Sequence, residues 1–128
     1  MSRLILDAGA FIAFERGEVA VRARLAAARR LGISVVTTSP VVGQVWRDGR
    51  RQALLARLLA ATQVWAPDEA AARRAGEILA RTGAHDVVDA LLVGLARDGD
   101  TVVSGDRDDI TRLLAAAGVR AAVVAASA

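Results

Sequence analysis

Cysteine, lysine and tyrosine are absent from this chain of 128 residues, and these absences narrow the chemistry open to it. Without cysteine there are no disulfides, no thiolate metal ligands and no thiol nucleophile. Aromatic residues make up only 3% of the sequence, so a stacking platform for single-stranded bases is not expected. No apolar run reaches the roughly 20 residues of a membrane span, and the first three residues lead into a strand pattern rather than a signal peptide. We therefore expect a cytoplasmic protein without membrane association.

Apolar and basic residues, by contrast, are abundant. Hydrophobic residues make up 54% of the chain, and its length fits one domain spanning residues 1–128. All 17 positively charged side chains are Arg, whose guanidinium group matches phosphate with two parallel hydrogen bonds. Genomic codon bias would produce the same Arg content, and a net charge of +3 only mildly favours a polyanionic partner. Composition alone leaves both explanations open.

Short β-branched runs alternate along the chain with segments of helical periodicity. The predicted strands are 4–6, 33–37, 62–65, 101–104 and 120–124, and the predicted helices are 8–16, 18–31, 39–48, 50–61, 67–82, 86–98 and 107–117. Each run is typical of a buried strand rather than one that alternates between apolar and polar residues, and buried strands suit a parallel sheet covered on both faces. The alternation predicts an α/β fold, a three-layer α/β/α sandwich with a mainly parallel sheet of four to five strands.

Three carboxylates stand out by their positions. Asp7 ends the first predicted strand, Asp106 follows the strand 101–104, and Asp89 lies one turn inside an otherwise apolar helix. Ligands of open α/β sheets bind outside the carboxyl ends of the strands. If the two strands are neighbours, Asp7 and Asp106 share one edge of the sheet, and the helix that begins near Asp86 brings Asp89 to the same place.

Each of these acids except Asp89 also has a simple structural explanation. Asp7, Asp86 and Asp106 all stand where a helix N-cap is expected, and Asp is a favoured N-cap residue. Asp89 is harder to explain in this way, because an ionised carboxylate among Val, Ala and Leu is costly unless something compensates its charge. Both interpretations of the other three acids remain open.

Carboxylates at close range repel one another, so some of them take up protons or share a cation. With oxygen ligands only, no Cys and one His, the natural cation is Mg²⁺ or Mn²⁺. Such an ion lowers the pKa of a bound water and neutralises charge on a phosphate oxygen, which is the chemistry of phosphodiester hydrolysis. Phosphotransfer through an aspartyl phosphate on Asp7 fits less well, because the second acid usual near such a nucleophile is missing and position 9 is Gly.

Four segments of the chain resemble the PIN-domain ribonucleases, and within them the VapC-type toxins of toxin–antitoxin pairs. The segments are Leu6-Asp7-Ala8-Gly9-Ala10-Phe11-Ile12-Ala13, Thr38-Ser39-Pro40-Val41-Val42-Gly43-Gln44-Val45-Trp46, Asp86-Val87-Val88-Asp89-Ala90-Leu91-Leu92-Val93 and Val103-Ser104-Gly105-Asp106. The resemblance covers essentially the whole chain and depends on all four segments occurring in this order.

The resemblance implies an endoribonuclease in which a quartet of acids binds Mg²⁺ or Mn²⁺. Asp7, Asp89 and Asp106 correspond to the first, third and fourth acids of that quartet. Ser104 corresponds to a supporting hydroxyl, and Asp86 and Asp109 correspond to accessory acids. The family also implies a homodimer, an RNA substrate and a small cognate antitoxin that blocks the site.

Gln44 departs from the family pattern, because Glu normally stands at this position. An amide oxygen can ligate a cation, but it carries no negative charge and cannot act as a base. Asp48, four residues later on the same predicted helix, is a candidate for a partial substitute. The departure leaves an alternative function, a catalytically weakened or inactive PIN domain that binds RNA or a protein.

The basic segment after Gln44 also allows two interpretations. Arg47, Arg50 and Arg51 either hold RNA phosphates beside the site or form a solvated helix end, where Arg is favourable. Trp46 and Trp65 are predicted to be core or interface anchors rather than base-stacking residues.

Overall fold

The computed structural model describes residues 2–127, and in this part of the chain five strands alternate with seven helices. The strands are β1 (Leu4–Leu6), β2 (Val35–Thr38), β3 (Gln63–Trp65), β4 (Thr101–Ser104) and β5 (Ala122–Ala125). The helices are α1 (Ala8–Glu15), α2 (Val19–Leu31), α3 (Ser39–Val45), α4 (Ala53–Ala60), α5 (Glu69–Thr82), α6 (Val87–Leu95) and α7 (Arg107–Ala117). Within residues 2–127, no helix has the length and apolar content needed to span a membrane.

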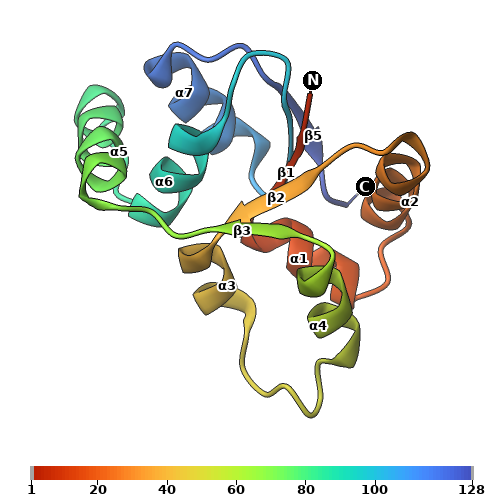
Figure 1. Ribbon diagram of the computed structural model, residues 1–128. Coiled ribbons are helices and arrows are strands. Elements are labelled where there is room, and N and C mark those ends of the chain that lie inside the picture. Colours follow the sequence, from red (N-terminus) through yellow and green to blue (C-terminus); the bar gives the residue numbers. More distant parts are fainter. Residues whose placement is uncertain (1, 128) are drawn as a thin grey trace.

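All five strands run parallel in one sheet, in the order β3-β2-β1-β4-β5. The helices α1 to α4 lie together on one side of the sheet, and α5, α6 and α7 pack against one another on the other side (Figure 1). The predicted three-layer α/β/α sandwich is therefore confirmed, with the larger of the expected strand numbers. Because β1 and β4 are adjacent, Asp7 and Asp106 follow neighbouring strands at one edge.

The central strand β1 lies in the core of the sheet. Every residue of β1 is buried, and Ile5 and Leu6 have no exposed surface. Burying such a side chain contributes about 1.5–3 kcal/mol. The prediction that every strand is buried is wrong for β3, whose three residues are all exposed, and for β5, in which no residue is fully buried. The strand β3 lies at the sheet edge, where Trp65 is 47% exposed and Val64 is 44% exposed.

The segment between α3 and α4 departs most from the predicted helices. The helix α3 ends at Val45, because Trp46 adopts an extended backbone with ψ of 130°. Residues 46–52 then form a loop, in which the Gln52 side chain accepts hydrogen bonds from the backbone N–H groups of Arg47 (2.7 Å) and Asp48 (2.9 Å). Asp48 is therefore not on the same helix as Gln44, and its predicted role as a partial substitute for a helical acid loses its geometric basis.

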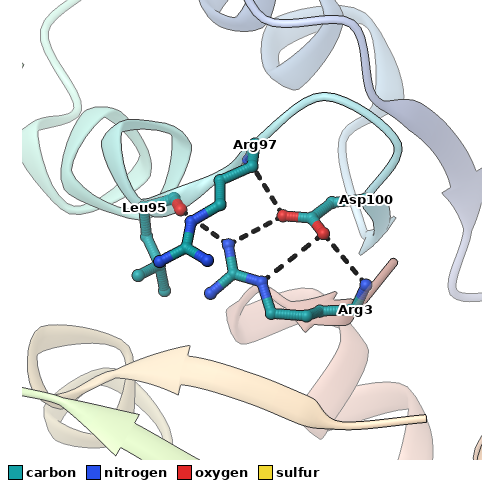
Figure 2. A network of polar contacts seen from close by, with 4 residues as sticks. All are labelled: Arg3, Leu95, Arg97 and Asp100. Atoms are coloured by element: carbon teal, nitrogen blue, oxygen red, sulfur yellow. Dashed lines mark hydrogen bonds and ion pairs between the residues drawn. The ribbon is translucent and has the colours of Figure 1, made fainter. Parts of the chain in front are cut away.

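A buried ion pair lies at the amino ends of the strands, opposite the carboxyl ends where Asp7 lies. Arg3 Nη2 lies 2.8 Å from Asp100 Oδ2 and also donates to the Leu95 carbonyl, as Figure 2 shows. The Asp100 carboxylate, 1% exposed, also accepts the backbone N–H groups of Arg3 and Arg97. Burial by itself raises the pKa of Asp100, but the hydrogen bonds from Arg3 and Arg97 outweigh it and hold that pKa below its usual value. The network joins the starts of β1 and β4 to the end of α6.

Candidate functional site

Asp7 is both a helix cap and a buried carboxylate at the carboxyl end of β1. It is 5% exposed, and its Oδ1 accepts the backbone N–H of Ala10 (2.8 Å) at the start of α1. Its Oδ2 accepts a 2.6 Å hydrogen bond from Ser104 Oγ, and the Gly105 N–H approaches both oxygens at 3.1 and 3.2 Å. Burial raises the pKa of Asp7, and the hydrogen bonds from Ser104, Ala10 and Gly105 reverse only part of that rise.

Ser104 connects Asp7 to the backbone of Asp106. It is the last residue of β4 and is 1% exposed. Its hydroxyl donates to Asp7 and accepts the backbone N–H of Asp106 at 2.8 Å. The Asp106 carboxylate is exposed and caps α7 by accepting the Asp109 N–H at 3.2 Å. The ends of β1 and β4 are thus tied together through one hydroxyl group.

Asp89 lies in the first turn of α6, which is capped by Asp86. Burial, followed by the negative charges of Asp86, Asp7, Asp109 and Asp106, raises the pKa of Asp89 to about 7. These five aspartates come from the starts of α1, α6 and α7, and we refer to them as the acidic cluster. The structure therefore brings all five predicted acids within electrostatic range of one another.

The acidic cluster fits a divalent cation by its chemistry and charge. Its donors are carboxylate oxygens, the ligands preferred by Mg²⁺ and Mn²⁺, and a cation would relieve the repulsion that raises the pKa of Asp89. The fit in position is less complete. Among residues 2–127, no three Asp, Glu or His side chains are grouped closely enough to form a cation site as they stand. Cation binding therefore requires the carboxylates to draw closer.

One hollow lies beside Asp106, and another lies on the side of the sheet covered by α2 and α4. One, of about 420 Å³, lies at the ends of β4 and β5 and is lined by residues that include Ser104, Gly105, Asp106 and Arg107. The other is a largely apolar groove of about 930 Å³ between α2 and α4. Its lining includes Phe14, Leu25, Leu58 and three arginines, Arg22, Arg29 and Arg57. The first hollow is at the edge of the sheet that carries the acidic cluster.

Comparison with known sequences places this arrangement in a family. The sequence profile of the PIN domain matches residues 4–115. The chain belongs to the PIN domain family. It is similar to Ribonuclease VapC10 of Mycobacterium tuberculosis, from strain CDC 1551 / Oshkosh and from strain ATCC 25618 / H37Rv, with 40% identity over 81 residues in each case. Each match covers 61% of this chain and 59% of the relative, so the similarity spans about three fifths of the curated proteins.

Gln44 occupies an exposed position in the last turn of α3 of this PIN domain. The helix α3 contacts both α1, which Asp7 caps, and α6, whose first turn holds Asp89. Gln44 therefore lies on a helix that packs against two of the helices that carry the acidic cluster.

The predicted phosphate-binding arginines lie in the exposed loop 46–52. Arg47 Nη1 donates to the carbonyl oxygens of Gly43 and Trp46 at the end of α3. Gln52 connects the loop to Glu15 at the end of α1, whereas Asp7 caps the start of that helix. An α-helix of eight residues is about 12 Å long, so the loop approaches α1 at the end far from Asp7. The sequence pattern did not predict this separation.

Three features of this edge were missed by sequence reasoning. A Cβ atom added to Gly9 would lie only 2.5 Å from the Cα atom of Gly105, so the two backbones are in direct contact. The Thr38 hydroxyl, at the end of β2, is buried and has no hydrogen-bond partner among residues 2–127. Trp46 and Trp65 are 38% and 47% exposed, so neither is a core anchor, and the interface and base-stacking interpretations both stay predictions. The one sequence feature that could have indicated the glycine contact is that Gly9 lies close to Asp7 and Gly105 directly precedes Asp106.

Proposed function

We propose that this PIN domain is an Mg²⁺- or Mn²⁺-dependent endoribonuclease that hydrolyses RNA phosphodiesters. The observation that carries the proposal is the acidic cluster, in which four carboxylates and burial raise the pKa of Asp89 to about 7. Such a concentration of negative charge at the carboxyl edge of a parallel sheet is typical of a ligand site that holds a cation. The similarity to Ribonuclease VapC10 supports RNA as the substrate class.

In this proposal Asp7, Asp89 and Asp106 hold the cation, and Asp86 and Asp109 contribute further negative charge. When bound, the cation would supply an acidic water and neutralise charge on the scissile phosphate. Ser104 fixes the orientation of Asp7 through the 2.6 Å hydrogen bond from its hydroxyl. The hollow of about 420 Å³ beside Asp106 provides room for the RNA backbone.

RNA phosphates farther from the cation would be held by Arg47, Arg50 and Arg51. The exposure of all three supports this role. Guanidinium groups at such a distance position the RNA backbone and carry no base specificity of their own.

The proposed context is a type II toxin–antitoxin pair, with this chain as a cytoplasmic toxin that forms a homodimer. The groove between α2 and α4 supports a protein partner, because an apolar floor bordered by Arg22, Arg29 and Arg57 complements an acidic amphipathic segment. A small cognate antitoxin of that character would bind there and abolish RNA cleavage.

The decisive experiment measures RNA cleavage and Mn²⁺ affinity on the same preparations. The native chain is expected to cleave RNA only with Mg²⁺ or Mn²⁺, and Asp7→Asn and Asp106→Asn to lose both cleavage and calorimetric Mn²⁺ binding. Glu77→Gln, which removes an exposed charge on α5, is the matched control and should behave like the native chain. Cleavage that persists in Asp7→Asn, or absence of cleavage at every metal concentration, would contradict the proposal.

A second candidate function is a binding module that retains the fold but cuts RNA poorly or not at all. The observation that favours it is Gln44 on α3, a helix that packs against α1 and α6, because an amide there contributes no charge. Asp48 lies in the loop beyond α3, so it does not restore an acid to that helix. RNA binding without cleavage in the native chain, with cleavage gained in Gln44→Glu, would identify this function.

A further inference from the structure

Gly9 and Gly105 are in contact through their backbones at the centre of the candidate site. A Cβ atom added to Gly9 would lie 2.5 Å from the Cα and 2.7 Å from the backbone nitrogen of Gly105. A Cβ atom added to Gly105 would lie 2.9 Å from the Cα of Gly9. Backbone atoms cannot swing away as a flexible side chain can, so any substitution must move the start of α1 away from the segment after β4.

Glycine is required at these two positions because there is no room for a Cβ atom, and not because of the backbone conformation. Neither residue has a positive φ, in contrast to Gly32 and Gly83, which end α2 and α5 in the left-handed conformation. Gly9 lies within the first turn of α1, where Ala is intrinsically the better helix former. The contact therefore outweighs the local preference of the helix.

The contact sets the polar arrangement around Asp7. It brings the Gly105 N–H to 3.1 and 3.2 Å from the two Asp7 oxygens, beside the hydroxyl of Ser104. The same short segment carries Asp106, whose N–H donates to Ser104. A side chain at either glycine would thus shift Asp7 and Asp106 relative to each other.

We propose that Gly9 and Gly105 are positioning residues whose backbone contact sets the separation of the Asp7 and Asp106 carboxylates. The proposal rests on the cation site of the proposed function. It assigns to two uncharged residues, 96 positions apart in the chain, control over how closely two acids can approach one cation. A purely structural contact would affect stability and leave cation affinity and the Asp7 hydrogen bonds unchanged.

The test compares Gly9→Ala with Gly76→Ala, a matched control in α5 where an added Cβ would meet nothing within 4 Å. In Gly9→Ala we expect the NMR signal of the Gly105 amide proton to lose the downfield chemical shift that a hydrogen bond to a carboxylate causes. We also expect calorimetric Mn²⁺ affinity to fall about tenfold or more, as for other groups that orient metal ligands. In RNA cleavage kcat should fall while KM stays nearly constant. Gly76→Ala should leave all three unchanged.

Gly105→Ala is the second variant, and it introduces a milder conflict because its Cβ lies farther from Gly9. It decides the question if Gly9→Ala does not fold, and it is expected to weaken Mn²⁺ binding in the same direction. A folded variant that keeps native Mn²⁺ affinity, or a Gly9→Ala protein with an unchanged Gly105 resonance, overturns the proposal. A native chain that binds Mn²⁺ without cleaving RNA contradicts only the nuclease function, because the affinity and resonance measurements do not depend on cleavage.

Discussion

Single aspartates in this chain serve two purposes at once. Asp7, Asp86 and Asp106 each accept the N–H of the residue three positions later and so cap a helix. The cap fixes each carboxylate at the end of its helix, where the partial positive charge of the helix terminus favours an anion. Because the three helices start near one edge of the sheet, the caps also gather negative charge there. Capping and ligand chemistry are therefore complementary in these residues.

Gln44→Glu should strengthen cation binding at the residue scale. The substitution adds a carboxylate of nearly the same size to a helix that packs against α1 and α6, and so adds negative charge to the surroundings of the acidic cluster. We expect Mn²⁺ affinity, measured by calorimetry, to rise about tenfold, which corresponds to about 1.4 kcal/mol. Gln63→Glu, which adds the same charge on the exposed edge strand, is the control. Equal effects of the two substitutions would show that only net charge matters.

Asp89→Asn should change how stability depends on pH in metal-free protein. The pKa of Asp89 is raised from 3.8 to about 7 by folding, so this group favours the folded state below pH 3.8 and that contribution is lost as pH rises through about 7. The variant should therefore be more stable than the native chain at pH 8, with the difference vanishing toward pH 4. Thermal unfolding with a chelator measures this, and Asp108→Asn, an exposed acid outside the cluster, is the control. A difference independent of pH would contradict the assignment.

At the scale of secondary-structure elements, the amino ends and the carboxyl ends of the strands have different roles. The amino edge is closed by the Arg3–Asp100 pair, with side chains 10% and 1% exposed, which joins β1, β4 and the end of α6. The carboxyl edge carries Asp7, Ser104 and Asp106. Strands anchored firmly at one end can hold repelling carboxylates close together at the other.

Asp100→Asn should destabilise the fold without altering the candidate site. It leaves the Arg3 guanidinium buried without its counter-charge, and breaking such a pair costs about 3–5 kcal/mol. Because the pKa of Asp100 is lowered by folding, the stabilisation is present above its unfolded value and is lost as pH falls through the folded pKa. Urea unfolding at pH 7 measures the loss, and Mn²⁺ affinity of the folded variant should remain native.

The control for this prediction is the exposed pair Arg73–Glu69 on α5, whose side chains are both 77% exposed. Glu69→Gln should change the free energy of unfolding by less than about 1 kcal/mol, because solvent screens such pairs. A cost for Asp100→Asn as small as that of the control would contradict a structural role for the buried pair.

At the scale of the whole molecule, the sheet order decides which surfaces stay open. The edge strand β3 is paired on one side only and presents Val64 and Trp65 to solvent. An edge strand with exposed apolar side chains is an available surface for association with another chain. This surface and the groove between α2 and α4 serve the two proposed protein contacts, the homodimer and the antitoxin.

Trp65→Lys should weaken self-association at this edge. Sedimentation measurements over a range of concentrations are expected to show a dimer of the native chain and a dissociation constant about tenfold or more higher for the variant, a loss of at least 1.4 kcal/mol. Leu31→Lys, which replaces another exposed apolar residue at the end of α2, is the control and should leave the dimer intact. A native monomer at all concentrations, or equal loss in both variants, would contradict a dimer through β3.

The sequence alone determined the elements and their alternation, because apolar periodicity, N-cap residues and β-branched runs act between neighbours in the chain. The limits of 4–6, 101–104 and 107–117 were predicted as they stand in β1, β4 and α7. Tertiary structure decided which strands lie inside the sheet, and the place of β3 at the edge is why Val64 and Trp65 are exposed. It also ended α3 before Asp48.

The candidate site was likewise predicted in part from the sequence and decided in part by the tertiary structure. Its acids were identified from the sequence, because each follows a strand or starts a helix. Their grouping, the pKa of Asp89 and the contact between Gly9 and Gly105 depended on the folded chain. Charge repulsion and close packing act through space, and Asp7 and Gly9 lie some 80 to 100 positions before Asp89, Gly105 and Asp106. A local sequence pattern does not specify distances between such segments.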